Sequence, residues 1–188
     1  FEKMNLSGEY QRWQVVTDDV RAFPIYDEVG RCINDRDFEK AGKLLSELNE
    51  FIPMEKPINK QFKERIGTHL KYGQKLINKE EARECFKNIL EYTIPYEMAL
   101  KEGERYLTNA EIMCLLNILY IKEPEITPIF SMLINLCEQM EQDEGISEHI
   151  ALWEIIMTNV ANTYGNIGEY RKSEQISLKI MKESICCY

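Results

Sequence analysis

The sequence predicts an all-α fold built from helical hairpins. Apolar residues recur at the three-to-four-residue spacing of amphipathic helices along most of the chain, and no stretch alternates apolar and polar residues for long enough to indicate a strand. Start and stop signals divide the chain into roughly eight or nine helices. The 188 residues, 44% of them hydrophobic and 29% charged, suffice for one sizeable core, so we expect a single domain over residues 1–188.

The boundaries between the predicted helices follow in order along the chain. Each combines capping residues, proline or glycine, which are typical of helix starts and ends. They are Ser7 with Gly8 and Glu9, Thr17 with Asp18 and Asp19, residues 34–37, Pro53 with Pro57, Asn78 with Lys79, Pro95, Thr108 with Asn109, Pro124 with Pro128, Gly145 with Ser147, and residues 165–168. Pro24 lies inside an apolar pattern, so it should either open a helix or kink one.

The charge balance is strongly acidic. Lys and Arg number 23 against 32 Asp and Glu, which gives a net charge of −9 and a pI near 4.9. Direct binding of nucleic-acid phosphates by this chain is therefore not expected. No apolar run approaches the roughly 18 residues that span a bilayer, and the start FEKMNLSGEY has no secretion pattern, so we expect a cytoplasmic protein without a membrane partner.

The sequence gives little support for catalysis, a metal site or a cofactor. His69 and His149 lack HExxH or CxxC neighbours, so surface or interhelical roles are expected for both. No nucleophile-elbow or phosphate-loop motif is present, and the glycines at 165–168 belong to the turn of a helical hairpin. The cysteines have no CxxC spacing, which indicates reduced and mostly buried thiols. They are Cys32, Cys85, Cys114, Cys137, Cys186 and Cys187.

The stretch NVANTYGNIGEYRKSEQISLKIMKES, residues 159–184, carries the pattern of a tetratricopeptide repeat (TPR). Small, aromatic, glycine, aromatic and small residues occupy the expected positions, where small residues let two antiparallel helices approach and the glycine closes the first helix. These residues are Ala161, Tyr164, Gly168, Tyr170 and Ser173. The second small position is matched upstream by Ala41, Ala82 and Ile129, so it recurs after 41, 47 and 44 residues. Because these steps exceed the roughly 34 residues of a standard repeat, we expect an irregular, TPR-like, right-handed superhelical array, with a plain helical bundle as the alternative.

Three stretches in a fixed order carry a resemblance to a protein family. They are NKQFKERIGTHLKYGQKLINKEEARECFKNILEYTIP at 59–95, RYLTNAEIMCLLNILYI at 105–121 and the hairpin at 159–184. The chain resembles the C-terminal TPR-like regulatory domain of Cro/C1-type helix-turn-helix transcriptional regulators of Gram-positive bacteria, similar to the Rgg and PlcR peptide-sensing proteins. The resemblance covers nearly the whole chain. It departs from the family pattern at Ser177, where a large apolar residue usually packs, and at Pro124, which interrupts the third hairpin.

The resemblance implies a homodimeric regulator in which this domain binds a short peptide on its concave face and a separate N-terminal helix-turn-helix binds DNA. We expect the DNA-binding part to be absent from this chain, because nothing before residue 60 shows the short helix, glycine turn and recognition helix of that motif. The final helix, 173–188, has no following repeat to cover Ile176, Ile180 and Ile185. Since the ends of such arrays must be capped or paired, this surface should join a homodimer or continue into further residues.

The ligand is expected against the first helix of each hairpin, whose second, fifth, ninth, twelfth and thirteenth residues face the groove in TPR-like arrays. In the last hairpin these positions hold Ile155, Thr158, Asn162, Gly165 and Asn166. Asn162 is the strongest single candidate, since one side-chain amide can bind both the N–H and the C=O of a peptide unit. A solvated helix asparagine is the alternative.

The other hairpins supply further candidates by the same count. In the second hairpin they are Glu64, Gly67, Lys71, Gln74 and Lys75; in the first, Tyr26 and Gly30; in the third, Glu111, Cys114 and Ile118, with Asn117 one position away. Lys71 and Lys75 are suited to receive a ligand carboxylate, and the alternative is a solvated charged face.

The sequence therefore predicts a ligand-sensing and dimerisation domain of a bacterial transcriptional regulator, with no enzymatic activity, cofactor or metal. A free-standing TPR adaptor that binds the tail of a partner protein is the alternative. A third class, an aspartyl-phosphate phosphatase or another enzyme built on helical repeats, rests on architecture alone, and loss of turnover on mutating an inward acid such as Glu64 would support it.

Overall fold

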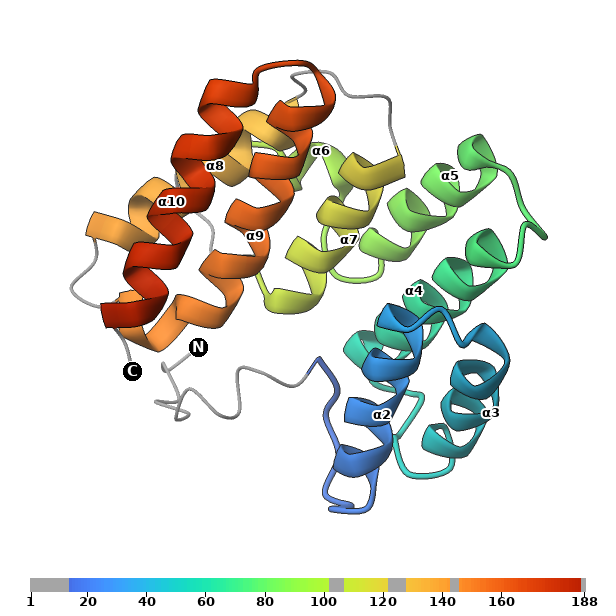
Figure 1. Cartoon of the computed structure of the whole chain (residues 1–188). Helices are drawn as coiled ribbons and strands as arrows, with labels where there is room; N and C mark the ends of the chain where they lie inside the picture. The colour runs from blue at the N-terminus through green and yellow to red at the C-terminus, as the bar shows by residue number, and fades with distance from the viewer. Residues whose placement is uncertain (1–13, 102–106, 122–127, 143–145, 187–188) are drawn as a thin grey trace.

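The chain is all-helical in the part that the structure describes, which confirms the predicted class. The computed structural model describes residues 14–101, 107–121, 128–142 and 146–186. Over these ranges there are nine helices and no strand: α2 (Ala22–Asn34), α3 (Phe38–Leu48), α4 (Pro57–Gly73), α5 (Lys79–Leu90), α6 (Tyr96–Ala99), α7 (Asn109–Ile121), α8 (Pro128–Gln142), α9 (Ile146–Asn166) and α10 (Tyr170–Cys186) (Figure 1). The predictions that concern Ser7, Pro124, Gly145, Cys187 and Tyr188, and the side chains of His149, Ile185 and Cys186, lie outside the described part.

The helices begin where local sequence signals place them. Asn78 and Glu81 form a reciprocal capping box at α5: the Asn78 side chain accepts from the Glu81 N–H at 2.9 Å, and Glu81 Oε2 accepts from the Asn78 N–H at 2.8 Å. Pro57 and Pro128 occupy the first positions of α4 and α8, where a missing N–H costs nothing. Pro24 falls in the first turn of α2, so it opens this helix and does not kink it.

Three helices end with the same turn. A residue with positive φ follows each of them: Arg36 (60°) after α2, Lys75 (61°) after α4 and Gly168 (86°) after α9. In each case the next N–H donates back to the carbonyl five residues earlier, as in a Schellman motif. The bonds are Asp37 to Cys32 at 2.8 Å, Leu76 to Lys71 at 2.9 Å and Glu169 to Tyr164 at 2.9 Å. The same backbone turn therefore connects α2 to α3, α4 to α5 and α9 to α10.

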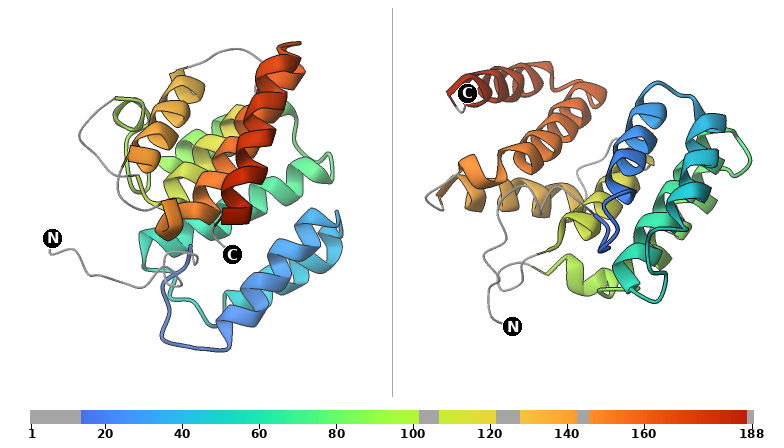
Figure 2. Two further views of the ribbon diagram at one scale, coloured as in Figure 1. Left: turned by 60° about the vertical axis from the view of Figure 1, so that its left-hand side comes forward. Right: turned by 90° about the horizontal axis from the view of Figure 1, so that it is seen from below.

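Neighbouring helices pack in chain order. The helices α2 and α3, α4 and α5, and α9 and α10 pack as antiparallel hairpins, while α3 contacts α4, α5 contacts α7, and α8 contacts α9. The helix α7 also touches both α4 and α9. Figure 1 shows the resulting succession from α2 and α3 at one end to α9 and α10 at the other, and Figure 2 shows it from two further directions.

Buried apolar side chains form two clusters that meet at α4. The first cluster joins α2, α3 and one side of α4, which contributes Phe62, Ile66 and Leu70. The second cluster extends over α5 to α9 and includes the fully buried Phe86 and Trp153. The apolar stripes of α7 and α8 belong to it, with Ile112, Leu115, Leu116, Leu119, Met132 and Leu133 buried and Leu136 and Met140 packed at its edge. Cys32, Cys114 and Cys137 are buried free thiols and Cys85 is half-buried, as predicted.

The last helix is tied to the second cluster by Glu141 of α8. This carboxylate accepts from Trp153 Nε1 of α9 at 3.0 Å and from Lys179 Nζ of α10 at 2.5 Å. Ile176 and Ile180 were expected on the uncovered face of α10, but both pack against the second cluster. The exposed apolar residues of α10 are instead Tyr170, Leu178 and Met181, which are 72%, 55% and 53% exposed.

The shared turn leads to a prediction about Arg36 and Gly168. Arg36→Gly should raise the free energy of unfolding by about 1 kcal/mol, because glycine adopts positive φ without a Cβ clash. Gly168→Ala should lower it by a similar amount, since a Cβ there meets no atom within 4 Å and only the backbone conformation is unfavourable. Urea unfolding measures both changes. Gly30→Ala is the control: it lies within α2 with equally open surroundings and ordinary φ, so it should gain stability. A loss for Arg36→Gly would contradict this account.

Candidate ligand site on α4

The helix α4 has a second buried side, and it is polar. Gln61, Arg65 and Thr68 are 0%, 5% and 7% exposed, and His69 is half-buried. These residues recur at a helical spacing, so they follow one side of α4, next to the apolar side formed by Phe62, Ile66 and Leu70. A helix that is buried on two sides must satisfy its polar groups with partners from neighbouring elements.

Arg65 and Gln61 each have one buried side-chain atom without a hydrogen-bond partner among the described residues, and of the two only Arg65 carries a charge. Arg65 Nη2 donates to Gln14 Oε1 at 2.5 Å, whereas Arg65 Nε has no partner in this part of the chain. Within the described residues no carboxylate forms an ion pair with it, and the centre of the Phe62 ring lies 5.6 Å from the guanidinium carbon. Burial lowers the pKa of Arg65, which expresses the cost of holding its charge there. Because a guanidinium stays protonated, the site keeps a buried positive charge that lacks an acidic partner among the described residues.

His69 of α4 and Cys114 of α7 lie close enough to Arg65 to interact with it electrostatically, and Asn117 of α7 forms a hydrogen bond with His69. Burial lowers the pKa of His69, the Arg65 charge lowers it further, and a side-chain hydrogen bond with Asn117 acts in the opposite direction. Burial raises the pKa of the Cys114 thiol to about 12, so it is not a nucleophile at neutral pH. Tyr26 of α2 also lies near Arg65 and stacks on Phe62 with ring centroids 5.0 Å apart. We call Arg65, His69, Cys114, Asn117 and Tyr26 the Arg65 cluster.

A non-helical segment, residues 14–17, crosses α4 beside this cluster, and we call it the strap. The fully buried Asn59 holds its backbone: Oδ1 accepts from the Val16 N–H at 2.7 Å, and Nδ2 donates to the Val16 carbonyl at 2.8 Å. Thr17 Oγ1 donates to the Phe51 carbonyl at 2.6 Å, and Val15 is buried in the first cluster. The strap therefore meets α4 at two points, with the Gln14 side chain at Arg65 and the Val16 backbone at Asn59.

The candidate residues predicted from the sequence fall into separate groups. The structure brings Tyr26 and Asn117 into the Arg65 cluster, where Asn117 also donates to the Met113 carbonyl at 2.7 Å. Thr158, Asn162 and Asn166 are exposed and share one face of α9 with Ile155, which is 42% exposed. Lys71 and Lys75 are exposed at the end of α4, and Lys75 adopts positive φ in the turn.

The prediction for the third hairpin needs correction. Glu111, Cys114 and Ile118 were expected to face a groove, but they are 6%, 0% and 0% exposed. Glu111 caps its own helix, since Oε2 accepts from the Thr108 N–H at 2.7 Å. In the second hairpin Glu64 is also engaged: it accepts from the Tyr92 hydroxyl at 2.6 Å, which raises the pKa of Tyr92 to about 12.

Sequence reasoning missed Arg65, Asn59 and Gln61. Their spacing along α4 is that of a solvated polar face, so periodicity alone assigns them to the surface. The available signal was that Phe62, Ile66 and Leu70 already define one apolar side, while a helix in the middle of an all-helical chain must also pack against later helices. His69, for which a surface or interhelical role was expected, is interhelical.

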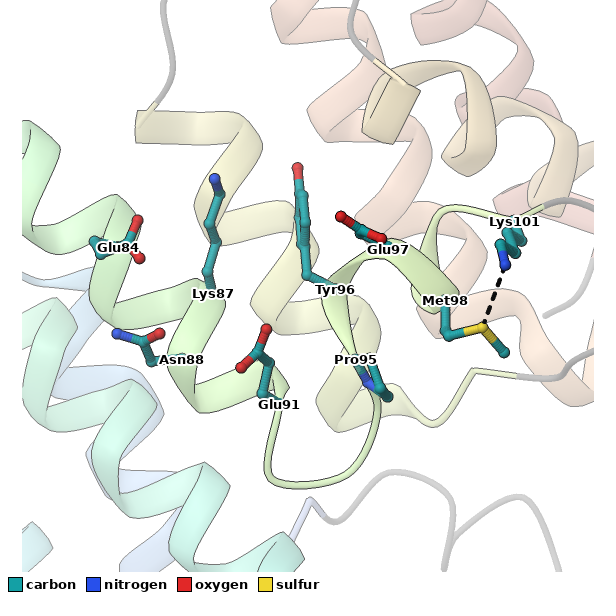
Figure 3. A pocket seen from close by; sticks show the side chains of 9 residues that line it. All are labelled: Glu84, Lys87, Asn88, Glu91, Pro95, Tyr96, Glu97, Met98 and Lys101. Carbon is teal, nitrogen blue, oxygen red and sulfur yellow. Dashed lines mark hydrogen bonds between the residues drawn. The ribbon is translucent and has the colours of Figure 1, made fainter.

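A depression of about 360 Å³ lies between α5 and the short α6, away from the Arg65 cluster's residues (Figure 3). Its lining mixes acids with lysines, and Lys87 Nζ lies 4.9 Å from the centre of the Tyr96 ring. Lys101 Nζ approaches the Met98 sulfur at 3.6 Å. None of the side chains that line it combines deep burial with an unmet hydrogen bond, as Arg65 does, so this depression is the weaker candidate.

No group of three or more His, Cys, Asp or Glu side chains among the described residues is arranged to hold a metal ion. None of the helices, over the same residues, is both long and apolar enough to cross a membrane. Comparison of the chain with protein-family models, curated proteins and solved structures finds no match.

The burial of His69 leads to a prediction about pH. Its pKa in the folded chain lies below the value of about 6.5 that an unfolded chain shows, so the unfolded state binds more protons as the pH falls through that value. The free energy of unfolding should therefore decrease between about pH 7.5 and about pH 5.5. His69→Gln should remove this part of the pH dependence, as measured by urea unfolding at several pH values. An unchanged slope, or an NMR titration that gives His69 a pKa above 6.5, would contradict the interpretation.

Proposed function

We propose that this chain is the ligand-sensing and dimerisation domain of a bacterial transcriptional regulator, and that it binds a short peptide. The observation that carries the proposal is the Arg65 cluster, in which polar groups from α2, α4 and α7 converge around a buried cation without an acidic partner among the described residues. Buried charges in proteins are normally paired. A ligand that supplies the missing negative charge accounts for the exception.

A TPR-like, right-handed array of hairpins is part of the proposal. Two observations support it: three hairpins share the same closing turn, and α7 touches both α4 and α9. Contacts between successive first helices are what a stacked array requires, because each repeat contacts its neighbours. The first helices then line a common side on which a ligand can lie.

A peptide suits the polar groups that these first helices present. Thr158, Asn162 and Asn166 give α9 an exposed polar face, and amides can bind peptide N–H and C=O groups without reading the sequence. Lys71 and Lys75 add positive charge at the end of α4. In a chain with a net charge of −9, this local cationic character favours a ligand with an acidic group.

Regulation would follow from a change in the shape of the array. A ligand that binds one curvature better than another shifts the population toward that shape, and so alters the spacing of DNA-binding heads attached to a dimer. The exposed Tyr170, Leu178 and Met181 on α10 support a dimer surface at the end of the array.

Peptide binding can be tested with a random heptapeptide library carrying free and amidated C-termini. We expect the library to yield peptides that bind the wild type. The double variant Thr158→Ala, Asn162→Ala should bind them with a Kd at least tenfold higher than the wild type, as measured by fluorescence anisotropy. Glu174→Ala on exposed α10 is the matched control and should leave the Kd unchanged. Absence of any binder, or equal affinity of the double variant, would contradict the peptide assignment on α9.

The regulator assignment has its own test, which separates it from the adaptor alternative. A helix-turn-helix should be encoded within roughly a hundred residues upstream of this segment, and a library binder should change the affinity of the full protein for its DNA. If peptides bind but no such head is encoded, the adaptor that holds a partner's tail is favoured instead.

The dimer surface gives a further prediction. Leu178→Glu with Met181→Glu should weaken self-association at least tenfold, because two exposed apolar side chains are replaced by mutually repelling charges. Sedimentation velocity over a concentration series measures this change. Val20→Glu, at a side chain that is 73% exposed away from α10, is the control. A wild-type chain that stays monomeric at high concentration would contradict dimerisation through α10.

A further inference from the structure

One edge of the Arg65 guanidinium carries two N–H donors, and only one of them has a hydrogen-bond partner among the described residues. In a guanidinium the Nε–H and one Nη2–H point the same way and match the two oxygens of a carboxylate. Arg21 shows this arrangement in the same chain, with Nε 2.9 Å from Asp19 Oδ1 and Nη2 2.6 Å from Asp19 Oδ2. At Arg65 the same edge meets a single amide oxygen: Nη2 bonds to Gln14 Oε1 and Nε bonds to nothing among the described residues.

The group that occupies this edge belongs to a segment held like a bound peptide. Asn59 binds both the N–H and the C=O of Val16, a grip that does not depend on the side chain at that position. Two residues earlier, the Gln14 side chain reaches Arg65. The α4 surface thus binds a short stretch of polypeptide through one backbone contact and one side-chain contact.

We propose that the Nε–Nη2 edge of Arg65 is a carboxylate receptor, that Gln14 fills it incompletely when no ligand is bound, and that a carboxylate of the peptide ligand replaces Gln14 there and frees the Gln14 end of the strap. This inference rests on the proposed peptide-sensing function and specifies its chemistry. A carboxylate satisfies both N–H groups and carries the charge opposite to that of Arg65, whereas the Gln14 amide offers a single neutral oxygen. The carboxylate can belong to the peptide's C-terminus or to an Asp or Glu side chain.

Release of the Gln14 end of the strap provides the link to regulation. The strap precedes α2 by a few residues, on the N-terminal side of the described helices, where the proposed DNA-binding head would be attached. Loss of the Gln14 contact leaves the Val16 grip and the Thr17 bond to hold this segment. A ligand at Arg65 therefore acts on the part of the chain nearest the head.

The substitution Gln14→Glu tests the receptor without any ligand. It places a carboxylate on the half-used edge, so the thermal midpoint Tm should rise by about 3 °C or more, as expected for one gained charge-assisted bond in a chain of this length. Val16→Glu is the matched control: it adds the same charge to the strap at a side chain that is 50% exposed, and it should not raise Tm. In the Arg65→Lys background the gain from Gln14→Glu should fall to less than half, because an ammonium lacks the paired donors.

The receptor assignment is overturned if Gln14→Glu leaves Tm unchanged or lowers it, or if Val16→Glu gives the same gain. An undiminished gain in Arg65→Lys also overturns it. If Arg65→Lys does not fold, the comparison of Gln14→Glu with Val16→Glu decides the question alone.

The library peptides test the ligand part separately. Gln14→Glu should bind them at least tenfold more weakly than the wild type, because its own carboxylate occupies the edge. Peptides that lose affinity on C-terminal amidation use their terminal carboxylate, and those that lose it only on Asp→Asn or Glu→Gln exchange use a side chain. Equal affinity of Gln14→Glu and wild type overturns the displacement at Arg65 even if peptides bind. A library without binders, together with a stabilising Gln14→Glu, overturns the peptide function while the carboxylate receptor stands.

Discussion

The burial of the polar side of α4 is the constraint on which the rest of the structure depends. Three residues on this helix can satisfy their hydrogen bonds only with partners from other elements. Asn59 needs the backbone of the strap and Pro53; Gln61 donates to the Ile89 carbonyl at 3.2 Å and to Thr93 Oγ1 at 2.9 Å; Arg65 needs Gln14. Hydrogen bonds are directional, so these contacts fix the position of α4 more narrowly than apolar packing would. The helix is thereby held at one register between the strap on one side and the end of α5 on the other.

This position makes α4 the connection between the two apolar clusters. Its apolar side completes the cluster of α2 and α3, and its contacts with α5 and α7 lead into the cluster that extends to α9. The Arg65 cluster lies where these parts meet, with Tyr26 from one hairpin and Asn117 from another. In the proposed array, a change in what Arg65 binds would act on the relation between these hairpins.

The fold was more predictable from the sequence than the site, because helix ends depend on local chemistry. Asn78 with Glu81, Pro57 and Gly168 act through atoms a few residues away, so their effects are readable without knowledge of the neighbours. Arg65 is different: its spacing along α4 is that of a solvent-facing residue, and only the docking of α7 and the strap buries it.

The helix α7 illustrates the same limit, since it is apolar nearly all round and its periodicity does not define an inner face. The sequence consequently predicts Glu111 in the groove, although Glu111 caps its own helix. Asn117, one position from the predicted inward residue Ile118, reaches the Arg65 cluster instead. The array arrangement, the ligand and the dimer remain predictions.

An incompletely satisfied arginine is what the proposed sensing function requires. Were residue 14 a glutamate, the edge of Arg65 would be filled within the chain, and a ligand carboxylate would gain nothing by entering. Gln14 holds the strap in place through a neutral acceptor, but it leaves one donor of Arg65 without a partner among the described residues. A ligand carboxylate can therefore gain free energy by binding there. Only the difference in binding free energy between the ligand carboxylate and Gln14 can shift a conformational equilibrium. About 1.4 kcal/mol is needed for each tenfold change in population. Among the described residues Arg65 Nε makes no hydrogen bond, so the chain lacks the stabilisation that this bond would give. In the proposed mechanism, the free energy of that bond drives the coupling between ligand and strap.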